Sequence, residues 1–417
     1  MNSQHASIGT CALSTMLSLV VSVFTVTGQA KAQCQYDVTV LQFPIDCGIG
    51  TVITTGLSLN DNGAVVGRYK CPISKYSQGF LWTAEGGFVG LEPPPGVIQV
   101  IPTDINDQGV ICGTMIVADV GFRGFVYDDG VWTVLPPVVD IPGAWSSAAA
   151  ISNEGIVVGR RSLRVDTAPQ NAYIWSPEQG FTDLTILGDN SAATAINGTR
   201  VVGWRADAGQ EKEGFLWRDG KVTLFGAIPD GLCSQANAVN ESAIVAGSGR
   251  IPSKGASTTV SRGFVWENGQ FTIIEPIEGY HHSGSVGDIN SHMEVVGASI
   301  KEDNPNDRKG YLWREAITYD LNDLVISKED LLIEGGAANN DAGLIVALGN
   351  NAQGGSVSFL LIPITRTGDL DGDCAIGISD LLLLLEQWGM TNSAADLNAD
   401  GIVGILDLLI LLANWGS

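Results

Sequence analysis

Two acidic segments near the C-terminal end of the chain hold the residues best suited to chemistry. Oxygen-bearing side chains occupy the first, third, fifth and twelfth positions of each segment. These are Asp369, Asp371, Asp373 and Asp380 in the first segment, and Asp396, Asn398, Asp400 and Asp407 in the second. A hard cation such as Ca²⁺ takes roughly six to eight oxygen ligands, which short side chains at alternate loop positions can supply. Ala375 and Ile402, at the seventh positions, are expected to add backbone carbonyls. The sequence therefore predicts two calcium ions, one in each segment.

Each acidic segment runs into a leucine-rich helix, expected at Leu381–Gly389 and Leu408–Gly416. Both helices are far shorter than the roughly 20 residues that span a bilayer. Because they are apolar on nearly every side, they must be buried against each other or against a partner. The duplicated loop–helix unit at residues 369–416 is similar to a type I dockerin, a small EF-hand-like α-helical module.

The dockerin resemblance implies calcium at the loop residues named above and docking to a cohesin-like protein partner. Cys374 departs from the pattern, because glycine is favoured at the sixth position, where the loop turns sharply. The alternative is that the two acidic turns cap their helices without binding a metal.

Seven copies of one unit precede the acidic segments. Each copy has a strand of small residues, a turn rich in Asn, Asp and Gly, and a strand that reads Val-Val-Gly in four copies and a close variant of it in the others. The asparagine position of the turn recurs every 43 to 50 residues, at residues 60, 106, 152, 197, 240, 290 and 340. A second motif, Gly79–Trp82, recurs in step with the first, and its tryptophan is expected to fill the space between neighbouring units. This period is typical of four-stranded propeller blades.

The seventh copy lacks a fourth strand after Phe359–Ile364, whereas Tyr36–Leu41 reads as a strand with no unit of its own. Pairing these two segments would complete the last blade and remove an exposed sheet edge. The sequence thus predicts a mainly β fold, a seven-bladed β-propeller of four-stranded blades, followed by the small α-helical EF-hand-like (dockerin) module. An open β-solenoid of the same units is the alternative.

Residues 36–364 also resemble the HAF-type extracellular repeat proteins of bacteria, which are named for a motif near the Gly79–Trp82 position. That resemblance implies a secreted protein with a propeller fold. It implies no activity and no catalytic residue.

The N-terminal segment reads as an export signal. An apolar run at Cys11–Thr27 is followed by a small-x-small cleavage site at Ala30–Ala32. We therefore expect a signal peptide at 1–32, the propeller at 33–365 and the calcium module at 366–417, in a secreted or cell-surface protein with no membrane span after cleavage. An N-terminal membrane anchor is the alternative.

The cysteines of an exported chain can form disulfides. Cys34 and Cys47 are the expected pair, because both lie near the mature N-terminus. Cys112 occupies a repeat position that holds Val66 and Val158 in other copies, so we expect a buried apolar role.

The net charge and the absence of catalytic motifs limit the classes of function that the sequence supports. With 22 Lys+Arg against 45 Asp+Glu, the formal charge is −23, which argues against a nucleic-acid partner. No catalytic motif is present, and catalytic residues are not assigned. The sequence favours a non-catalytic binding or assembly protein, whose propeller recognises a glycan or a protein. The alternative is a polysaccharide-degrading hydrolase or lyase tethered through its dockerin-like module, which an acidic pair facing the channel mouth would favour.

Overall fold

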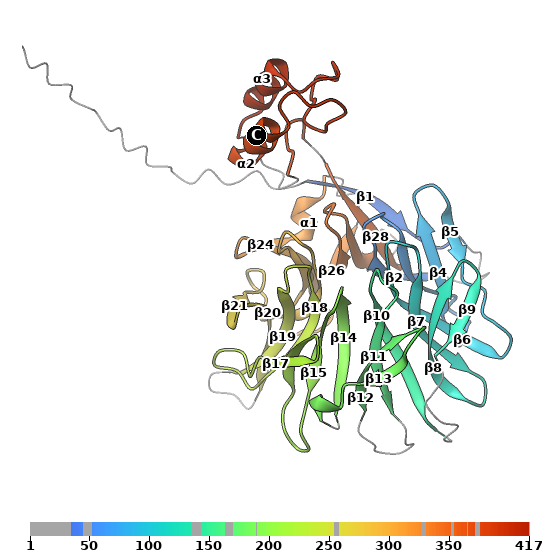
Figure 1. Ribbon diagram of the computed structural model, residues 1–417. Coiled ribbons are helices and arrows are strands. Elements are labelled where there is room, and N and C mark those ends of the chain that lie inside the picture. Colours follow the sequence, from blue (N-terminus) through green and yellow to red (C-terminus); the bar gives the residue numbers. More distant parts are fainter. Residues whose placement is uncertain are drawn as a thin grey trace, which may run out of the picture.

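The computed structural model describes residues 35–44, 52–135, 143–162, 170–188, 190–253, 258–326, 331–351, 354–364, 366–371 and 376–416. Seven four-stranded antiparallel sheets surround a common axis, as Figure 1 shows. The predicted seven-bladed β-propeller of four-stranded blades is therefore confirmed. The expected signal peptide at 1–32 lies outside the described residues.

Six blades follow the chain in order, each from its innermost strand outward. Blade 1 comprises β2 (Ile53–Leu59), β3 (Val65–Lys70), β4 (Gln78–Thr83) and β5 (Gly87–Gly90), and blade 2 comprises β6 (Val97–Ile105), β7 (Ile111–Val117), β8 (Gly121–Asp128) and β9 (Val131–Val134). Blade 3 comprises β10 (Trp145–Ile151), β11 (Val157–Ser162), β12 (Asn171–Ser176) and β13 (Gly180–Asp183), and blade 4 comprises β14 (Ser191–Asn197), β15 (Arg200–Arg205), β16 (Glu213–Arg218) and β17 (Lys221–Leu224). Blade 5 comprises β18 (Cys233–Val239), β19 (Val245–Pro252), β20 (Thr259–Glu267) and β21 (Gln270–Ile274), and blade 6 comprises β22 (His282–Ile289), β23 (Val295–Ile300), β24 (Arg308–Arg314) and β25 (Ile317–Asp320).

The seventh blade is built from both ends of the propeller sequence. Its strands are β26 (Leu332–Asn339), β27 (Ile345–Asn350), β28 (Ser356–Pro363) and, outermost, β1 (Tyr36–Leu41). Tyr36 lies opposite Pro363 and Leu41 opposite Ser358, and both Tyr36 and Leu41 are fully buried. The N-terminal strand thus closes the ring as the sequence predicts, and it covers the edge of β28.

The repeated asparagine holds neighbouring blades together. Asn60 Oδ1 accepts a hydrogen bond from the Ala64 N–H (2.9 Å), and Asn60 Nδ2 donates to the Asn106 carbonyl in the next blade (2.9 Å). Asn340 Nδ2 donates to the Asn60 carbonyl (3.0 Å), which links the last blade to the first. These turns define one end of the propeller, called here the turn end. Pro363 packs beside Gly343 of the last such turn, so the chain leaves the propeller at the turn end.

The Val-Val-Gly motif makes room for an aromatic ring. A Cβ atom on Gly67 would lie 2.1 Å from the Thr55 carbonyl oxygen and 2.8 Å from the Phe80 ring. The aromatic residue at the Phe80 position is fully buried in all seven blades: Phe80, Phe125, Tyr173, Phe215, Phe264, Tyr311 and Phe359. The tryptophan expected between blades, two residues later, is buried at Trp175, Trp266 and Trp313 and partly exposed at Trp82 and Trp217. The deepest aromatic position of the repeat is therefore the one that the glycine faces.

Four short helices complete the described structure. In the propeller, η1 (Thr185–Leu187) and α1 (Leu321–Leu324) are single turns, and the C-terminal module has α2 (Ile378–Glu386) and α3 (Ile405–Ala413). No helix among the described residues is both long and apolar enough to cross a membrane.

The cysteines differ in state. Cys112 is free and fully buried, as its repeat position predicts, and Cys233 is also free and buried. Cys71 is disulfide-bonded, which the sequence did not predict. The expected Cys34–Cys47 pair lies outside the described residues.

Candidate functional site

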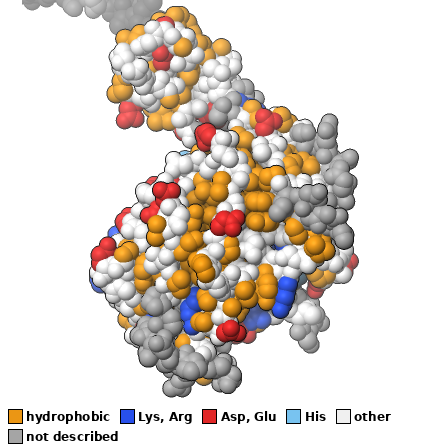
Figure 2. Space-filling model, turned by 90° about the vertical axis from the view of Figure 1, so that its right-hand side faces the viewer, with side chains coloured by type: hydrophobic (Ala, Val, Ile, Leu, Met, Phe, Trp, Pro, Cys, Tyr) orange, Lys and Arg blue, Asp and Glu red, His pale blue; other side chains and the backbone are white. Residues whose placement is uncertain are grey.

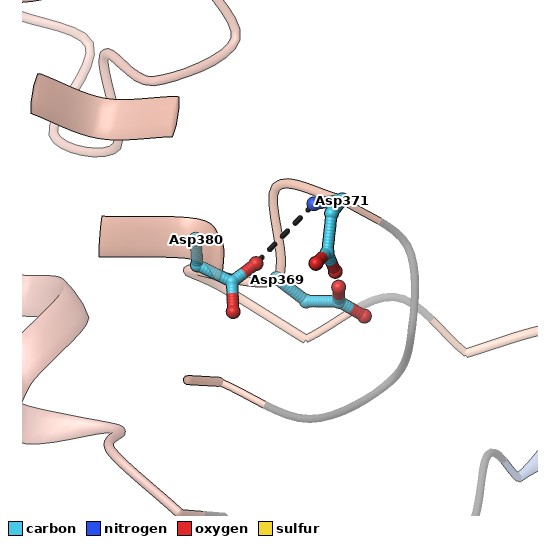
Figure 3. Close-up of side chains that lie close together, drawn as sticks. All are labelled: Asp369, Asp371 and Asp380. Carbon is cyan, nitrogen blue, oxygen red and sulfur yellow. Dashed lines mark hydrogen bonds between the residues drawn. The ribbon is translucent and has the colours of Figure 1, made fainter. Parts of the chain in front are cut away.

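The first acidic loop brings three carboxylates together. One oxygen of each of Asp369, Asp371 and Asp380 lies within 4.8 Å of the others, in front of helix α2 (Figure 3). Asp380 is almost fully buried and accepts hydrogen bonds from the N–H groups of Leu370 (2.6 Å) and Gly377 (2.7 Å). A set of converging carboxylate oxygens suits a hard cation such as Ca²⁺. The other two predicted ligands, Asp373 and Ala375, lie outside the described residues.

The second acidic loop has the same design with different hydrogen bonds. Asp396 accepts from the N–H groups of Asp400 (3.1 Å) and Gly401 (2.8 Å). Asn398 Nδ2 donates to Asp400 Oδ2 (2.9 Å), and the Ile402 N–H donates to Asp400 Oδ1 (3.1 Å). The side chains of Asp396, Asn398 and Asp400 all carry oxygen atoms that can ligate a metal, and they lie on one turn of chain, so this loop also suits a hard cation.

Asp407 shows how the loop and the helix are coupled. It is fully buried at the first turn of α3 and accepts from the Gly404 N–H (2.7 Å) and the Asn398 N–H (3.1 Å). Burial alone would raise the pKa of Asp407, but these backbone donors outweigh burial and hold the pKa below its usual value. Asp407 therefore stays ionised, and its charge is also well placed at a helix N-terminus.

A small core holds the two loop–helix units together. It contains Ile376, Leu384, Ala395, Val403 and Leu411, with one buried leucine from each helix. Two backbone hydrogen bonds connect the units across this core: the Gly416 N–H donates to the Ile376 carbonyl (2.9 Å), and the Gly389 N–H donates to the Val403 carbonyl (2.9 Å). The two units thus form one compact module.

Most of the apolar surface of the two helices stays outside that core. Ile378 and Ile405 are 70% and 60% exposed, and each begins a row of exposed apolar side chains along its helix. The paired apolar rows are Ile378, Leu382, Leu385 and Trp388 in the first unit, and Ile405, Leu409, Leu412 and Trp415 in the second. In Figure 2 hydrophobic side chains are visible over much of the module surface. The helices therefore bury only a minor part of their apolar surface against each other.

The central channel of the propeller is a second candidate, which the sequence did not reveal. A cavity of about 410 Å³ is lined by the innermost strands and turns of all seven blades. Its described lining includes seven acidic residues and neither lysine nor arginine. The acids are Asp61, Asp104, Asp107, Glu154, Glu241, Asp288 and Asp341. The channel therefore attracts cations and repels anions.

Two of these acids lie inside the channel rather than at its turn end. Burial raises the pKa of Asp104 to about 6, even though Ser58 Oγ (2.6 Å) and the Ile151 N–H (2.8 Å) donate to it. Burial also raises the pKa of Asp288 to about 7, and the charge of Asp104 adds to the effect. Asp288 accepts from the N–H of Asn339 in the next blade (3.4 Å). Both carboxyl groups thus link neighbouring blades as well as lining the channel.

A sequence signal for these acids exists in the repeat. The position two residues before the turn asparagine holds serine or alanine in five copies: Ser58, Ala150, Ala195, Ala238 and Ala338. Only blades 2 and 6 have aspartate there. The sequence alone does not show that these two aspartates line the same channel, because that depends on how the blades close into a ring.

Comparison with known proteins identifies the fold alone. Neither a known protein family nor a curated protein matches the sequence. The β-propeller domain of the Trilobed protease from Pyrococcus furiosus is similar in structure, with a TM-score of 0.50 and 13% identity over 76% of this chain and 97% of that one. That domain has an open velcro topology, whereas β1 closes the ring here. Pyrococcus horikoshii acylaminoacyl peptidase gives a TM-score of 0.49 and 12% identity over 76% of this chain and 52% of that one. The Aleuria aurantia lectin gives a TM-score of 0.32 and 11% identity over 63% of this chain and 92% of that one.

Proposed function

We propose that the protein is a secreted or cell-surface binding protein with two working parts. The C-terminal module binds two calcium ions and docks to a cohesin-like protein partner. The propeller recognises a glycan or a protein. The proposal rests mainly on the paired apolar rows, which form a large exposed apolar surface on a module with two acidic loops.

Calcium is expected to shape the docking surface because each loop ends inside a helix. Asp380 and Asp407 lie in the first turns of α2 and α3 while also accepting N–H donors from the loops. A cation held by loop oxygens would neutralise the repulsion between neighbouring carboxylates. It would thereby fix the start of each helix, and with it the row of apolar side chains.

The apolar rows suit a protein partner better than solvent. Ile378, Leu382 and Leu385 are spaced so that they share one helix face, and Ile405, Leu409 and Leu412 repeat the spacing. Contiguous exposed apolar surface of this kind marks interaction sites in soluble proteins.

The test measures binding of residues 33–417 to a panel of immobilised bacterial cohesin modules. We expect binding in calcium and loss of binding in EDTA. Leu382→Asp/Leu409→Asp should abolish binding and keep the calcium response of the protein. Ile186→Asp, at an exposed apolar residue of the propeller, is the matched control and should bind normally. Absence of binding to every module, or equal binding by the double variant, would contradict the docking proposal.

A polysaccharide-acting enzyme is the second candidate, favoured by the Asp104–Asp288 pair. Carboxyl groups with pKa values of about 6 and 7 are suited to acid–base catalysis near neutral pH. Their hydrogen bonds to neighbouring blades already account for both residues structurally, so this candidate ranks second. Release of reducing ends that disappears in both Asp104→Asn and Asp288→Asn would establish it.

A further inference from the structure

Two tryptophans of the propeller do not belong to the repeated design. Trp145 begins β10, and Trp204 follows the Val-Val-Gly motif in β15. The other six copies have Arg68, Thr114, Arg160, Ser248, Ala298 and Leu348 at the position of Trp204. Trp204 is therefore particular to blade 4, where it packs against Ala192 and Ala206.

Each of these rings holds a cation. The Arg160 guanidinium lies 5.7 Å from the centre of the Trp145 ring, and Lys212 Nζ lies 4.1 Å from the centre of the Trp204 ring. Attraction to the ring face restrains a long side chain that would otherwise move freely. All four residues lie in blades 3 and 4, where β10 starts, β11 and β15 end and β16 begins, which is the end of the propeller opposite the turns.

The hydrogen-bonding partners of these two cations are neutral. Arg160 donates to Gln170 Oε1 (3.1 Å), and Lys212 donates to Gln235 Oε1 (3.1 Å). Among the described residues neither cation forms an ion pair.

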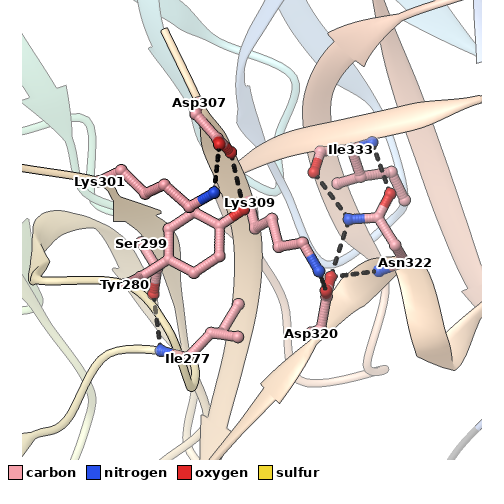
Figure 4. A network of polar contacts seen from close by, with 9 residues as sticks. All are labelled: Ile277, Tyr280, Ser299, Lys301, Asp307, Lys309, Asp320, Asn322 and Ile333. Atoms are coloured by element: carbon pink, nitrogen blue, oxygen red, sulfur yellow. Dashed lines mark hydrogen bonds and ion pairs between the residues drawn. The ribbon is translucent and has the colours of Figure 1, made fainter. Parts of the chain in front are cut away.

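Blade 6 shows the opposite arrangement at the same end of the propeller. In Figure 4 Lys301 pairs with Asp307 (2.6 Å), which also accepts a hydrogen bond from the Tyr280 hydroxyl (2.8 Å). Lys309 pairs with Asp320 in the same view. Lys301 and Lys309 of blade 6 are thus neutralised within the protein, whereas Arg160 of blade 3 and Lys212 of blade 4 have only neutral hydrogen-bonding partners.

The positive charges of blades 3 to 5 also repel one another. The pKa of Lys212 is lowered, first by partial burial and then by the charges of Arg160 and Arg250. Arg250 itself pairs with Glu211, so the uncompensated charge belongs to Arg160 and Lys212. An anion placed between them would relieve this repulsion.

A cavity of about 510 Å³ lies beside Lys212, whose pKa shows the charge of Arg160 to be near. Its walls include Trp204, Lys212, Gln235, Ser248 and the ion pair of Arg250 with Glu211. Sites for small ligands are typically roughly 300–1,000 Å³ in volume. Gln235 Nε2 donates to Ser248 Oγ (3.2 Å), so the wall offers amide and hydroxyl groups that can exchange partners with sugar hydroxyls. In Figure 2 the visible Lys and Arg side chains gather mainly at the end of the propeller away from the C-terminal module.

We propose that this cavity, together with Arg160, binds an acidic saccharide whose carboxylate contacts Lys212 and Arg160. The inference rests on the proposed glycan recognition and names the sugar class. Arginine and lysine both form charge-assisted hydrogen bonds to carboxylates, which are stronger than bonds between neutral groups. The amides of Gln170 and Gln235, now bonded to the cations, would turn to the sugar hydroxyls.

The test is calorimetric titration of residues 33–417, in calcium, with oligogalacturonate and separately with neutral cello-oligosaccharides. We expect oligogalacturonate to bind, with affinity that falls as salt concentration rises. Lys212→Gln and Arg160→Gln should each weaken it at least about tenfold, equivalent to about 1.4 kcal/mol. Lys221→Gln, at an exposed base on the outermost strand of blade 4, is the matched control and should bind as the unchanged protein does.

Three results would overturn the inference. The first is unchanged uronate binding by both Lys212→Gln and Arg160→Gln, with melting temperatures showing that both variants are folded. The second is equal or stronger binding of the neutral sugars, which would leave glycan recognition standing and remove only the acidic-sugar assignment. The third is binding of neither sugar, which would remove this assignment; proposed glycan recognition would fail as well if a wider glycan array were also silent.

Discussion

Replacing Asp288 in the channel should change how the stability of the propeller depends on pH. The pKa of this carboxyl group is raised from 3.8 to about 7 by burial and by the charge of Asp104. A shift of roughly 3 units corresponds to at most about 4 kcal/mol of free energy between the protonated and ionised forms. Asp288→Asn removes the titration and keeps one side-chain oxygen, which can accept from Ile289; the weaker bond from Asn339, to the second oxygen at 3.4 Å, is lost.

The direction in which the free energy of unfolding changes with pH follows from the protons bound by each state. The folded protein keeps the Asp288 proton up to about pH 7, whereas the unfolded chain loses it near pH 4. Between these values the folded state binds more protons, so the free energy of unfolding falls as pH rises. The contribution of Asp288 is fully present below pH 4 and lost above pH 7. Asp288→Asn should therefore be more stable than the unchanged protein at pH 8, by at most about 4 kcal/mol, and nearly equal to it at pH 4.

The assay is thermal unfolding of residues 33–417 at several pH values between 4 and 8, with calcium held constant. Glu154→Gln, an exposed acid at the turn end, is the control and should leave the pH profile unchanged. An identical pH profile for Asp288→Asn and the unchanged protein would refute the reasoning. A variant less stable at pH 8 would show that ionised Asp288 stabilises the ring.

Two further variants test how the ring is held together. Leu41→Ala should destabilise the propeller by about 2–5 kcal/mol, because Leu41 is fully buried in the closing strand; Val40→Ala, at a mostly exposed neighbour, should have a small effect, and equal unfolding midpoints for the two would argue against closure by β1. Asn340→Ala should cost about 1–3 kcal/mol, since it removes bonds to the Asn60 carbonyl (3.0 Å) and the Leu344 N–H (2.9 Å). Chemical denaturation measures this second loss, and an unchanged midpoint would show that the asparagine does not join the blades.

Much of the fold was predictable because the same sequence pattern occurs seven times. Turn chemistry at Asn60 and its equivalents fixed the period, and the surplus strand Tyr36–Leu41 predicted how the ring closes. The tryptophans expected between blades do pack there, since Trp175, Trp266 and Trp313 share buried clusters with the preceding blade. The deepest aromatic position was not predicted. Sequence spacing does not show which face of β4 meets Gly67, and that contact places Phe80 rather than Trp82 at the centre of the blade.

The functional residues were predictable only where they are local in sequence. Loop spacing alone identified Asp369 and Asp396 as parts of equivalent acidic loops. The meeting of the channel acids, and that of Arg160 with Lys212, depend on contacts between different blades. Such contacts follow from the number of blades and their order around the axis, which no single repeat contains.

The measurement that tests the central claim most directly is a calorimetric titration of residues 33–417 with calcium. The account predicts two ions bound per chain, and loss of both in Asp369→Ala/Asp396→Ala, because each substitution removes a first-position ligand. Absence of calcium binding, or two ions bound by the double variant, would contradict a C-terminal module organised by calcium.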